Sequence, residues 1–423
     1  MRRSIPIVAA ALGLGLALTA CSGDTGSKNP TTTPAPQATT SEAPKLSGEL
    51  SMWVDEERIK DLKGVAADFE AEYGVKVNLT QKAFGDIKTD FISQGAQEGG
   101  PDVVVGANDW TGELVANGLV APIQLGDAAS ELSDGGKAAF SDGGALYGVP
   151  YAVENIALIR NNEIVKDTPE TFEELLKQND ELKKDYPIVV QQDAKNGDAY
   201  HLYPLMTSFG ISFFKQAEDG TYITEAGFGG EQGTKFAEWL AAQGKNGAGW
   251  LSGDISGDVA ASAFREGKTP YIVTGPWNVV GGEGRFVESG MDVSVLPVPS
   301  AGGDVSRPFA GFQGFFVNAT SKNALAANAF ASYLGTSDVQ TKLYKEGGRI
   351  PVNTVSAAAV DDPILKGFAE AGVNAVPQPG FKEMDAVWGA IGSTQIQIID
   401  GKAKDPAKTW SDLTFSTGMD SPV

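Results

Sequence analysis

The chain has 423 residues, of which 42% are apolar and 21% charged, so it is too apolar to be disordered and too long for one core. We therefore expect two domains or lobes. Its 54 acidic and 33 basic residues give a formal net charge of -21, which would repel phosphate backbones and argues against a nucleic-acid partner. One Cys and one His exclude a disulfide framework and a clustered Cys/His zinc site, and no acidic spacing resembles a calcium loop, so we expect no metal and no cofactor.

Residues 1–20 predict a secretory signal peptide. Arg2 and Arg3 follow the first Met and supply positive charge, and the apolar run from Ile5 to Ala20 is too short for a comfortable membrane span. The run ends in the sequence Leu-Thr-Ala-Cys at 18–21, which resembles the lipobox of bacterial lipoproteins. That resemblance implies cleavage before Cys21, lipidation of its sulfur, and an extracytoplasmic protein anchored to the outer face of the cell membrane. The alternative is an ordinary signal peptide with an incidental Cys.

Residues 21–45 predict a flexible linker. They are mostly Ser, Thr, Pro, Ala, Gly and Asn, with almost no large apolar side chain, so they cannot bury enough surface to fold. We expect the linker to connect the lipid anchor to a folded body that begins near residue 46.

The folded body alternates predicted strands and helices. The first part of this body is a β-α-β-α-β series. We expect strands over 49–54, 75–79 and 103–105, a helix over 59–73 that ends at Gly74, and a second helix that buries Ile87 and Phe91. Such a series predicts a parallel sheet whose ligands gather at the carboxyl ends of the strands. Further on we expect a helix capped by Thr171 and reaching Leu182, strands over 271–273 and 293–296, and helices over 324–334, 339–345, 364–371 and 384–399.

Nucleotide-binding motifs and a Ser-His-Asp arrangement are not supported by the sequence. There is no phosphate-binding P-loop, and the glycines at 281–284 lack the spacing of a dinucleotide fingerprint. His201 has no nucleophile elbow to accompany it, so we interpret it as a packing or surface residue. A pair of carboxylates that hydrolyses glycosides remains open, because such a pair needs no fixed spacing.

Three aromatic residues follow predicted strands, where loops are expected. Trp110 comes after the strand at 103–105, Tyr200 after Val189-Val190, and Trp277 after the strand that ends at Gly275-Pro276. Flat rings beside acids suit sugars, because the C–H face of a pyranose stacks on the ring while a carboxylate accepts hydrogen bonds from its hydroxyls. For any single Trp, packing in the core is an equal alternative; together the aromatic residues favour a cleft.

From about Leu46 to its end the chain resembles the extracellular solute-binding proteins of sugar ABC transporters, and most closely maltose- and maltodextrin-binding proteins. The resemblance rests on the order and spacing of several segments, at 50–53, 100–103, 118–123, 148–154 and 275–277. It implies an α/β fold of the type II periplasmic-binding-protein class, with two lobes, a hinge, and the ligand in the cleft between the lobes. The implied lobe 1 comprises 46–153 and about 310–362, and lobe 2 about 154–309 and 363–423.

The resemblance also implies pocket residues, position by position. Asp109 and Glu154 match acids that bind sugar hydroxyls, Asp198 with Tyr200 resembles a Glu-x-Tyr pair that holds one glucose unit, and Trp277 matches a stacking Trp. Trp388 aligns with a further stacking Trp, with helix packing as the alternative.

Several positions depart from the family pattern. Trp110 stands where maltose-binding proteins can have Arg, which adds a stacking surface and removes a charged donor. Gly392 replaces an Arg, and Gly106 replaces a Trp. Glu57 and Arg58 replace an Asp-Lys pair across a one-residue gap, and a solvated helix start explains them equally well.

The implied function is capture without conversion. The expected protein is a monomer that binds a maltose- or maltodextrin-type oligosaccharide and presents it to a membrane permease, driven by a separate ATPase. The alternatives are a receptor for a different oligosaccharide and a secreted glycosidase.

Overall fold

The computed structural model describes residues 46–217 and 222–413. The predicted signal peptide, Cys21 and the linker over 21–45 lie outside these residues, as does the end of the predicted lobe 2 at 414–423. The described residues belong to one folded unit that begins at Leu46. Within them, no helix combines the length and the apolar character that crossing a membrane requires.

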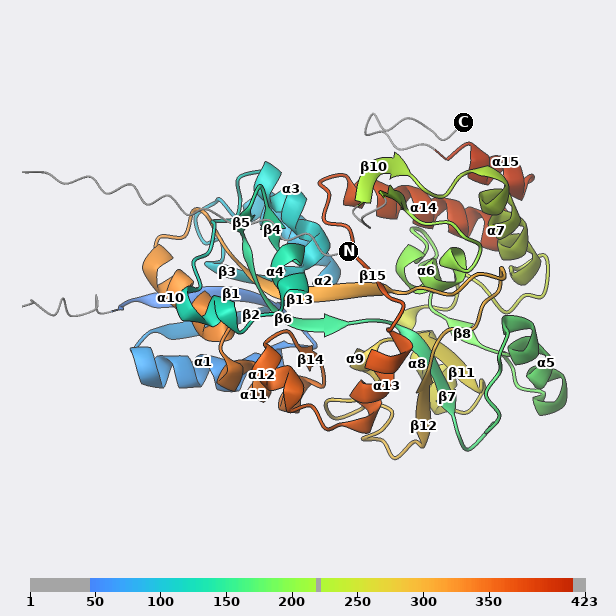
Figure 1. Ribbon diagram of the computed structural model, residues 1–423, viewed down its shortest axis with the longest axis horizontal. Helices are drawn as coiled ribbons and strands as arrows, with labels where there is room; N and C mark the ends of the chain where they lie inside the picture. The colour runs from blue at the N-terminus through green and yellow to red at the C-terminus, as the bar shows by residue number, and fades with distance from the viewer. Residues whose placement is uncertain (1–45, 218–221, 414–423) are drawn as a thin grey trace, which may run out of the picture. The chain divides into compact units, whose positions relative to one another are not determined.

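The first sheet has the order β14-β6-β13-β3-β1-β2, with β15 paired to β13 (Figure 1). Its strands are β1 (Glu49–Asp55), β2 (Lys76–Lys82), β3 (Val103–Ala107), β6 (Gly148–Glu154), β13 (Phe309–Val317), β14 (Ile350–Pro351) and β15 (Val376–Pro377). Strand β1 runs parallel to β2 and β3, as predicted, whereas β13 is antiparallel to both β3 and β6. The parallel pairing expected for the β-α-β-α-β series is confirmed, and the antiparallel β13 makes the whole sheet mixed.

Helices pack on this sheet through apolar faces at helical spacing. They include α1 (Ile59–Tyr73), α2 (Phe84–Gln94), α3 (Thr111–Ala116), α4 (Asp134–Ala139), α10 (Ala324–Leu334), α11 (Ser337–Gly347) and α12 (Thr354–Ala358). Helix α1 buries Leu62, Val65 and Phe69 and ends at Gly74, whose φ of 70° is left-handed, a conformation that glycine adopts without strain. A short hairpin, β4 (Ser141–Asp142) with β5 (Ala145–Leu146), precedes β6.

The second sheet has the order β12-β7-β11-β8. It comprises β7 (Ala157–Asn161), β8 (Val189–Val190), β11 (Tyr271–Thr274) and β12 (Val293–Leu296), with β7 antiparallel to β11 and β12. Side chains alternate between two buried clusters: Leu158 and Val273 lie in one, Ile159 and Ile272 in the other. The sheet is thus covered on both faces, which explains the continuous apolar run of β11.

The helices of this second half are α5 (Phe172–Leu182), α6 (Ala199–Thr207), α7 (Gly230–Gln243), α8 (Gly257–Arg265), α9 (Pro276–Val279), α13 (Pro363–Ala371), α14 (Met384–Ile399) and α15 (Pro406–Ser411). A second hairpin pairs β9 (Phe214–Gln216) with β10 (Tyr222–Ala226). The hydroxyl of Thr171 accepts a hydrogen bond from the amide of Glu174 at 3.2 Å, which confirms the predicted cap of α5.

The chain crosses between the two sheets at several points. Strand β6 ends at Glu154 in the first sheet and β7 starts at Ala157 in the second, a passage that Figure 1 shows as one continuous stretch of chain. Strand β13 lies in both cores, since Phe309 packs with the second core and Phe315 with the first. Strand β14 belongs to the first sheet, while α13, which follows it, packs with the core of the second through Phe368.

Candidate functional site

Asp109 and Trp110 lie immediately beyond the carboxyl end of β3. They form a short 3-10 helix, Asn108–Trp110, rather than the expected loop. Strand β3 lies between β1 and β13, so its end is the kind of position where α/β sheets bind ligands. Asp109 is only 6% exposed.

The indole of Trp110 is also only 6% exposed, and it packs against Phe84 with the ring centroids 5.2 Å apart. It covers Gly106, where a Cβ atom would collide with Cε3 of the indole. The ring thus takes the space that a side chain at position 106 would need, so the glycine at 106 and the tryptophan at 110 are one structural feature. The structure does not place Trp110 in ring contact with the other predicted stacking residues.

Trp277 follows β11 as Trp110 follows β3, and its ring also covers a glycine. The strand ends at Thr274, Gly275-Pro276 starts the short helix α9, and the ring of Trp277 folds back over Gly275. Trp277 is half-buried and sits in the first turn of a helix, not in a loop.

Tyr200 and Asp198 lie at the start of α6. Asp198 is the N-cap residue, whose carboxylate accepts a hydrogen bond from the amide of His201 at 2.9 Å, and Tyr200 follows in the first turn. The centroid of the Tyr200 ring lies 6.5 Å from that of Trp277 and 6.3 Å from that of Trp388. Three of the predicted aromatic residues, Tyr200, Trp277 and Trp388, therefore form one half-buried cluster.

Trp388 connects this cluster to Asp109. Its indole Nε1 donates a hydrogen bond to Oδ2 of Asp109 at 3.0 Å, although the two residues are 279 positions apart. The other oxygen of Asp109, Oδ1, is buried and has no hydrogen-bond partner among the described residues. Burial raises the pKa of the Asp109 carboxyl, against the opposing effects of Lys88 and the Trp388 hydrogen bond.

The predicted carboxylates converge on the phenol of Tyr200. Burial raises the pKa of Tyr200 well above its ordinary value, and the nearby charges of Glu154, Asp198 and Asp109 act in the same direction. Six of the nine predicted ligand residues are thus linked by direct contacts or by proximity to one phenol, namely Asp109, Glu154, Asp198, Tyr200, Trp277 and Trp388.

Glu154 lies at the end of β6 within a buried polar network. Its Oε2 accepts a hydrogen bond from Nε of Arg349 at 3.1 Å, and its Oε1 accepts one from Nε2 of Gln313 at 2.9 Å. Sequence reasoning missed both partners, because they lie far from Glu154 in the chain. Gln313 belongs to β13, and Arg349 directly precedes β14. Oε1 of Gln313 is buried without a partner among the described residues.

Arg58 belongs to this network rather than to a solvated helix start. Its guanidinium contacts Oδ2 of Asp55 at 2.8 Å and the hydroxyl of Tyr151 at 2.6 Å, and it lies 3.9 Å from Glu154. These neighbours raise the pKa of Arg58 although burial acts to lower it, so the guanidinium stays charged. A small cavity beside it is lined by Arg58, Asp61, Leu62, Tyr151, Phe315, Leu343 and Arg349.

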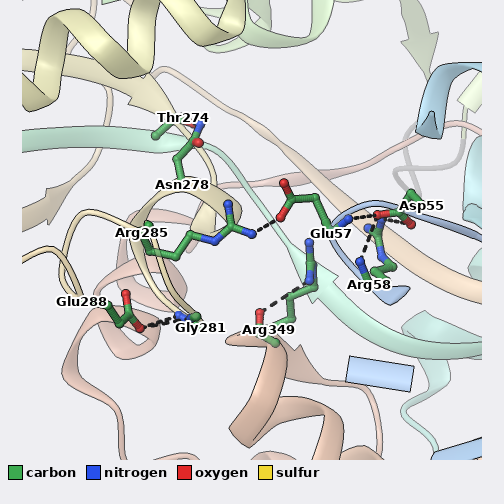
Figure 2. Close-up of polar contacts among 12 residues, drawn as sticks. Asp55, Glu57, Arg58, Thr274, Asn278, Gly281, Arg285, Glu288 and Arg349 are labelled. Atoms are coloured by element: carbon green, nitrogen blue, oxygen red, sulfur yellow. Dashed lines mark hydrogen bonds and ion pairs between the residues drawn. The ribbon is translucent and has the colours of Figure 1, made fainter. Parts of the chain in front are cut away.

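Glu57 makes an ion pair with Arg285, a residue that sequence reasoning did not single out. Figure 2 shows the guanidinium of Arg285 directed at the carboxylate of Glu57, with Arg349 close by. Glu57 follows β1 of the first sheet, whereas Phe286, next to Arg285, packs in the core of the second. The pair therefore joins segments that belong to different cores.

The loop of Arg285 also meets the first core through backbone. Glu288 accepts hydrogen bonds from the amides of Gly281 and Gly282, at 2.8 and 3.3 Å (Figure 2). A Cβ atom on Gly281 would clash with the backbone of Gly347 and Gly348. This close approach of two loops requires glycine at that position.

Gly392 explains one departure from the family pattern. It lies on α14 one turn beyond Trp388, and a Cβ atom there would collide with the carbonyl oxygen of Asn196. The loop that leads to Asp198 thus occupies the space that an Arg side chain at position 392 would need. Among the described residues, no group of three or more His, Cys, Asp or Glu side chains is placed to hold a metal ion.

Comparison with known proteins adds an independent finding. The family model described as bacterial extracellular solute-binding protein matches residues 64–367. A galactooligosaccharide-binding protein of Bacillus subtilis is 28% identical over 389 residues, which cover 88% of this chain and 89% of the relative. A maltooligosaccharide ABC transporter solute-binding lipoprotein of Streptococcus pneumoniae is 28% identical over 377 residues, covering 85% and 86%. The structure of a Thermus thermophilus maltotriose binding protein bound with maltotriose is 28% identical, with a TM-score of 0.75 over 86% of this chain and 97% of that one.

Proposed function

Because this chain belongs to the bacterial extracellular solute-binding protein family and has its two-lobed type II fold, we propose that it captures maltooligosaccharides and delivers them to the permease of an ABC importer. It acts as a receptor and not as an enzyme. The observation that carries the proposal is the cluster of Tyr200, Trp277 and Trp388 beside the buried carboxylate of Asp109.

This cluster has the two properties that carbohydrate recognition needs. Half-buried rings offer flat apolar surfaces for the C–H faces of pyranoses. The unpartnered Oδ1 of Asp109 is an acceptor for a sugar hydroxyl, and a buried acceptor without a partner costs about 1–3 kcal/mol until it finds a donor. A neutral oligosaccharide supplies both the stacking face and the donor.

The remaining predicted residues have supporting roles in the proposal. Glu154 and Asp198 present carboxylates at the edge of the same region, and Glu57 accepts a hydrogen bond from a sugar hydroxyl through Oε1 while its Oε2 stays paired with Arg285. Arg58 holds Glu154 in place through the buried network. Trp110 supports the Asp109 segment from beneath, and its ring, which is only 6% exposed, leaves little surface for stacking on a sugar.

Closure of two lobes supplies the mechanism. We take lobe 1 as 46–153 and about 310–362, and lobe 2 as about 154–309 and 363–423, with the hinge at the crossings of β6 to β7, β12 to β13 and β14 to α13. A sugar that contacts both lobes favours the closed form by the contacts it gains there. The permease then recognises the closed form, while a separate ATPase supplies the energy.

The proposed protein is a monomer outside the cytoplasm, tethered to the membrane by lipid at Cys21. The lipoprotein among its relatives supports this location. Two acyl chains suffice for a stable anchor, whereas the acidic body would gain little from an anionic membrane surface. Changing Cys21 to Ser should release the protein into the medium, as fractionation and immunoblotting would show; continued membrane retention would contradict lipid anchoring.

The function is tested by calorimetric titration with maltose, maltotriose and maltopentaose, with cellotriose as a control of different linkage. Stacking plus several hydrogen bonds typically supports micromolar affinity, about -8 kcal/mol. Absence of binding to every maltooligosaccharide would overturn the proposal. Galactooligosaccharides form the second candidate ligand class, which the Bacillus subtilis relative favours, so a galactotriose titration belongs to the same series.

The glycosidase alternative is tested in the same samples. Each sugar is incubated with the protein overnight and assayed for new reducing ends. We expect a saturable change in tryptophan fluorescence without product. Formation of reducing ends in proportion to protein concentration would show hydrolysis and overturn the receptor proposal.

A further inference from the structure

His201 lies beside Tyr200 and Trp277 of the candidate site, although its sequence context favoured a packing or surface role. It is the single histidine of the chain and is only 5% exposed. Its ring is nearly perpendicular to those of Tyr200 and Trp277, with centroid distances of 5.4 and 6.1 Å. The imidazole therefore adjoins two of the rings proposed to stack on sugar.

The carboxylate of Asp198 is already engaged by donors from the protein itself. Its Oδ1 accepts a hydrogen bond from the backbone amide of His201 at 2.9 Å. Its Oδ2 pairs with Nδ1 of the same histidine at 2.9 Å and accepts another hydrogen bond from Nε2 of Gln191 at 2.8 Å. Three protein contacts on one carboxylate leave it little capacity for a sugar hydroxyl.

The contact between Asp198 and Nδ1 determines which ring nitrogen of His201 carries a proton. A carboxylate accepts and does not donate, so the Nδ1 atom that faces it carries a proton. The opposite nitrogen, Nε2, is buried and has no hydrogen-bond partner among the described residues. A neutral ring would present Nε2 as an acceptor and a charged ring would present it as a donor, and a sugar hydroxyl can satisfy either.

We propose that Nε2 of His201 hydrogen-bonds a hydroxyl of the sugar unit that stacks on Trp277, and that Asp198 acts as the positioning residue for this imidazole. The inference rests on the proposed function. It moves the polar contact at this end of the site from the carboxylate at position 198 to the histidine three residues later. Asp198 serves two purposes at once, since it caps α6 and orients the ring.

Two substitutions separate the two nitrogens of the ring. His201→Asn retains a side-chain N–H near the position of Nδ1, where it can still reach Asp198, but removes the group at Nε2. His201→Gln places a polar group near the position of Nε2. Maltotriose affinity is measured by calorimetry, and unfolding by differential scanning calorimetry. We expect Asn to weaken binding about tenfold, the loss typical of one hydrogen bond, and Gln to weaken it less, with both melting temperatures near that of the unmodified protein.

Wild-type affinity in the Asn variant would overturn the proposal. A second measurement does not depend on whether the variants fold. Because the chain has one histidine, its ring nitrogens give a single pair of ¹⁵N signals in protein labelled with ¹⁵N and prepared without a histidine tag. Addition of maltotriose should shift the Nε2 signal, while the Nδ1 signal stays nearly constant.

The outcomes distinguish this inference from the proposed function. If maltotriose does not bind the unmodified protein, the proposed function fails. If it binds while both ring signals stay unchanged, the function stands and the assignment of His201 is wrong. If only the Nδ1 signal moves, the sugar disturbs Asp198 directly, which also contradicts the proposed contact.

Discussion

The two oxygens of Asp109 have different surroundings. Oδ2 holds the indole of Trp388, while Oδ1 is buried without a partner among the described residues. A helix start that served only packing would not retain an unsatisfied carboxylate oxygen, because its desolvation has a free-energy cost. The arrangement is one in which the ligand completes the hydrogen bonding of the protein.

Replacing Asp109 by Asn tests this interpretation. The amide keeps the shape of the side chain and can still accept from Trp388, but it presents an N–H₂ group where a sugar hydroxyl needs an acceptor. We expect maltotriose to bind at least tenfold more weakly, since hydrogen bonds to charged groups are worth about 1.5–3 kcal/mol. The free energy of unfolding should stay equal or rise, because burial disfavours the charge at this position. Calorimetry measures both the affinity and the free energy of unfolding. An unchanged affinity would show that Asp109 does not bind the sugar.

Trp277→Ala tests the stacking surface. Loss of the ring should raise the dissociation constant for maltotriose about tenfold or more, with a change in melting temperature of only a few degrees, because the ring is half-buried. Trp410→Ala is the matched control. Trp410 is almost fully buried and donates a hydrogen bond to the carbonyl of Phe228 at 2.9 Å, so its loss should lower the melting temperature by roughly 10 °C. A larger loss of stability in Trp277→Ala than in the control would make Trp277 a core residue.

At the scale of elements, local patterns predicted several of the long helices well, although α7 and α8 were not predicted. The helices over 59–73, 324–334 and 384–399 have the predicted bounds, because apolar spacing and glycine at the ends define them within a short stretch of sequence. Strand β13 was not predicted. Its sequence, Phe309–Val317, is interrupted by two glycines, and its partners β3 and β6 lie more than 150 residues away. Periodicity contains no information about such distant pairing.

The candidate site shows the same limit. The resemblance to a family singled out the aromatic residues and acids as candidates, since each occupies a recognisable segment. The contacts of Glu57 with Arg285 and of Glu154 with Arg349 depend on which loops meet in space. His201 was interpreted as a packing residue because the sequence does not show that its Nδ1 faces Asp198 while its Nε2 lacks a partner.

Helix α1 carries a buried acid whose effect on stability depends on pH. Burial raises the pKa of Asp61 to about 6 from its ordinary value of 3.8, although Arg349 and Lys60 oppose the shift. Between these two pH values the folded chain holds a proton that the unfolded chain has lost, so this group makes stability fall as pH rises from about 4 to 6. We expect Asp61→Asn to raise the melting temperature at about pH 7.5 and to have little effect near pH 4. A stabilisation independent of pH, seen in thermal melts across this range, would contradict the assignment.

At the scale of the whole molecule, the ion pair of Glu57 with Arg285 connects segments from the two cores. Arg285 is mostly buried, and burial lowers its pKa, with Arg349 acting in the same direction and Glu288 opposing it. The ion pair with Glu57 adds a second acidic partner for this buried charge. The pair forms where two glycine-containing loops already touch. It therefore contributes to holding the lobes together.

Arg285→Ala should shift the protein toward an open form. We expect a larger radius of gyration without sugar in small-angle scattering, and weaker maltotriose binding by a factor of about two to five, because less of the protein is in the competent form. Lys215→Ala is the control, since it breaks an exposed ion pair with Glu225 within the β9–β10 hairpin. Equal radii for Arg285→Ala and the control would show that the pair does not hold the lobes.

The interleaved path of the chain limits how this protein could be divided for engineering. Strand β13 pairs with both β3 and β6, yet it is translated long after them. A fragment that stopped before Phe309 would leave two strands with unpaired backbone edges, which recruit other chains and lead to aggregation. A split reporter built on this receptor would therefore need all three strands on the same fragment.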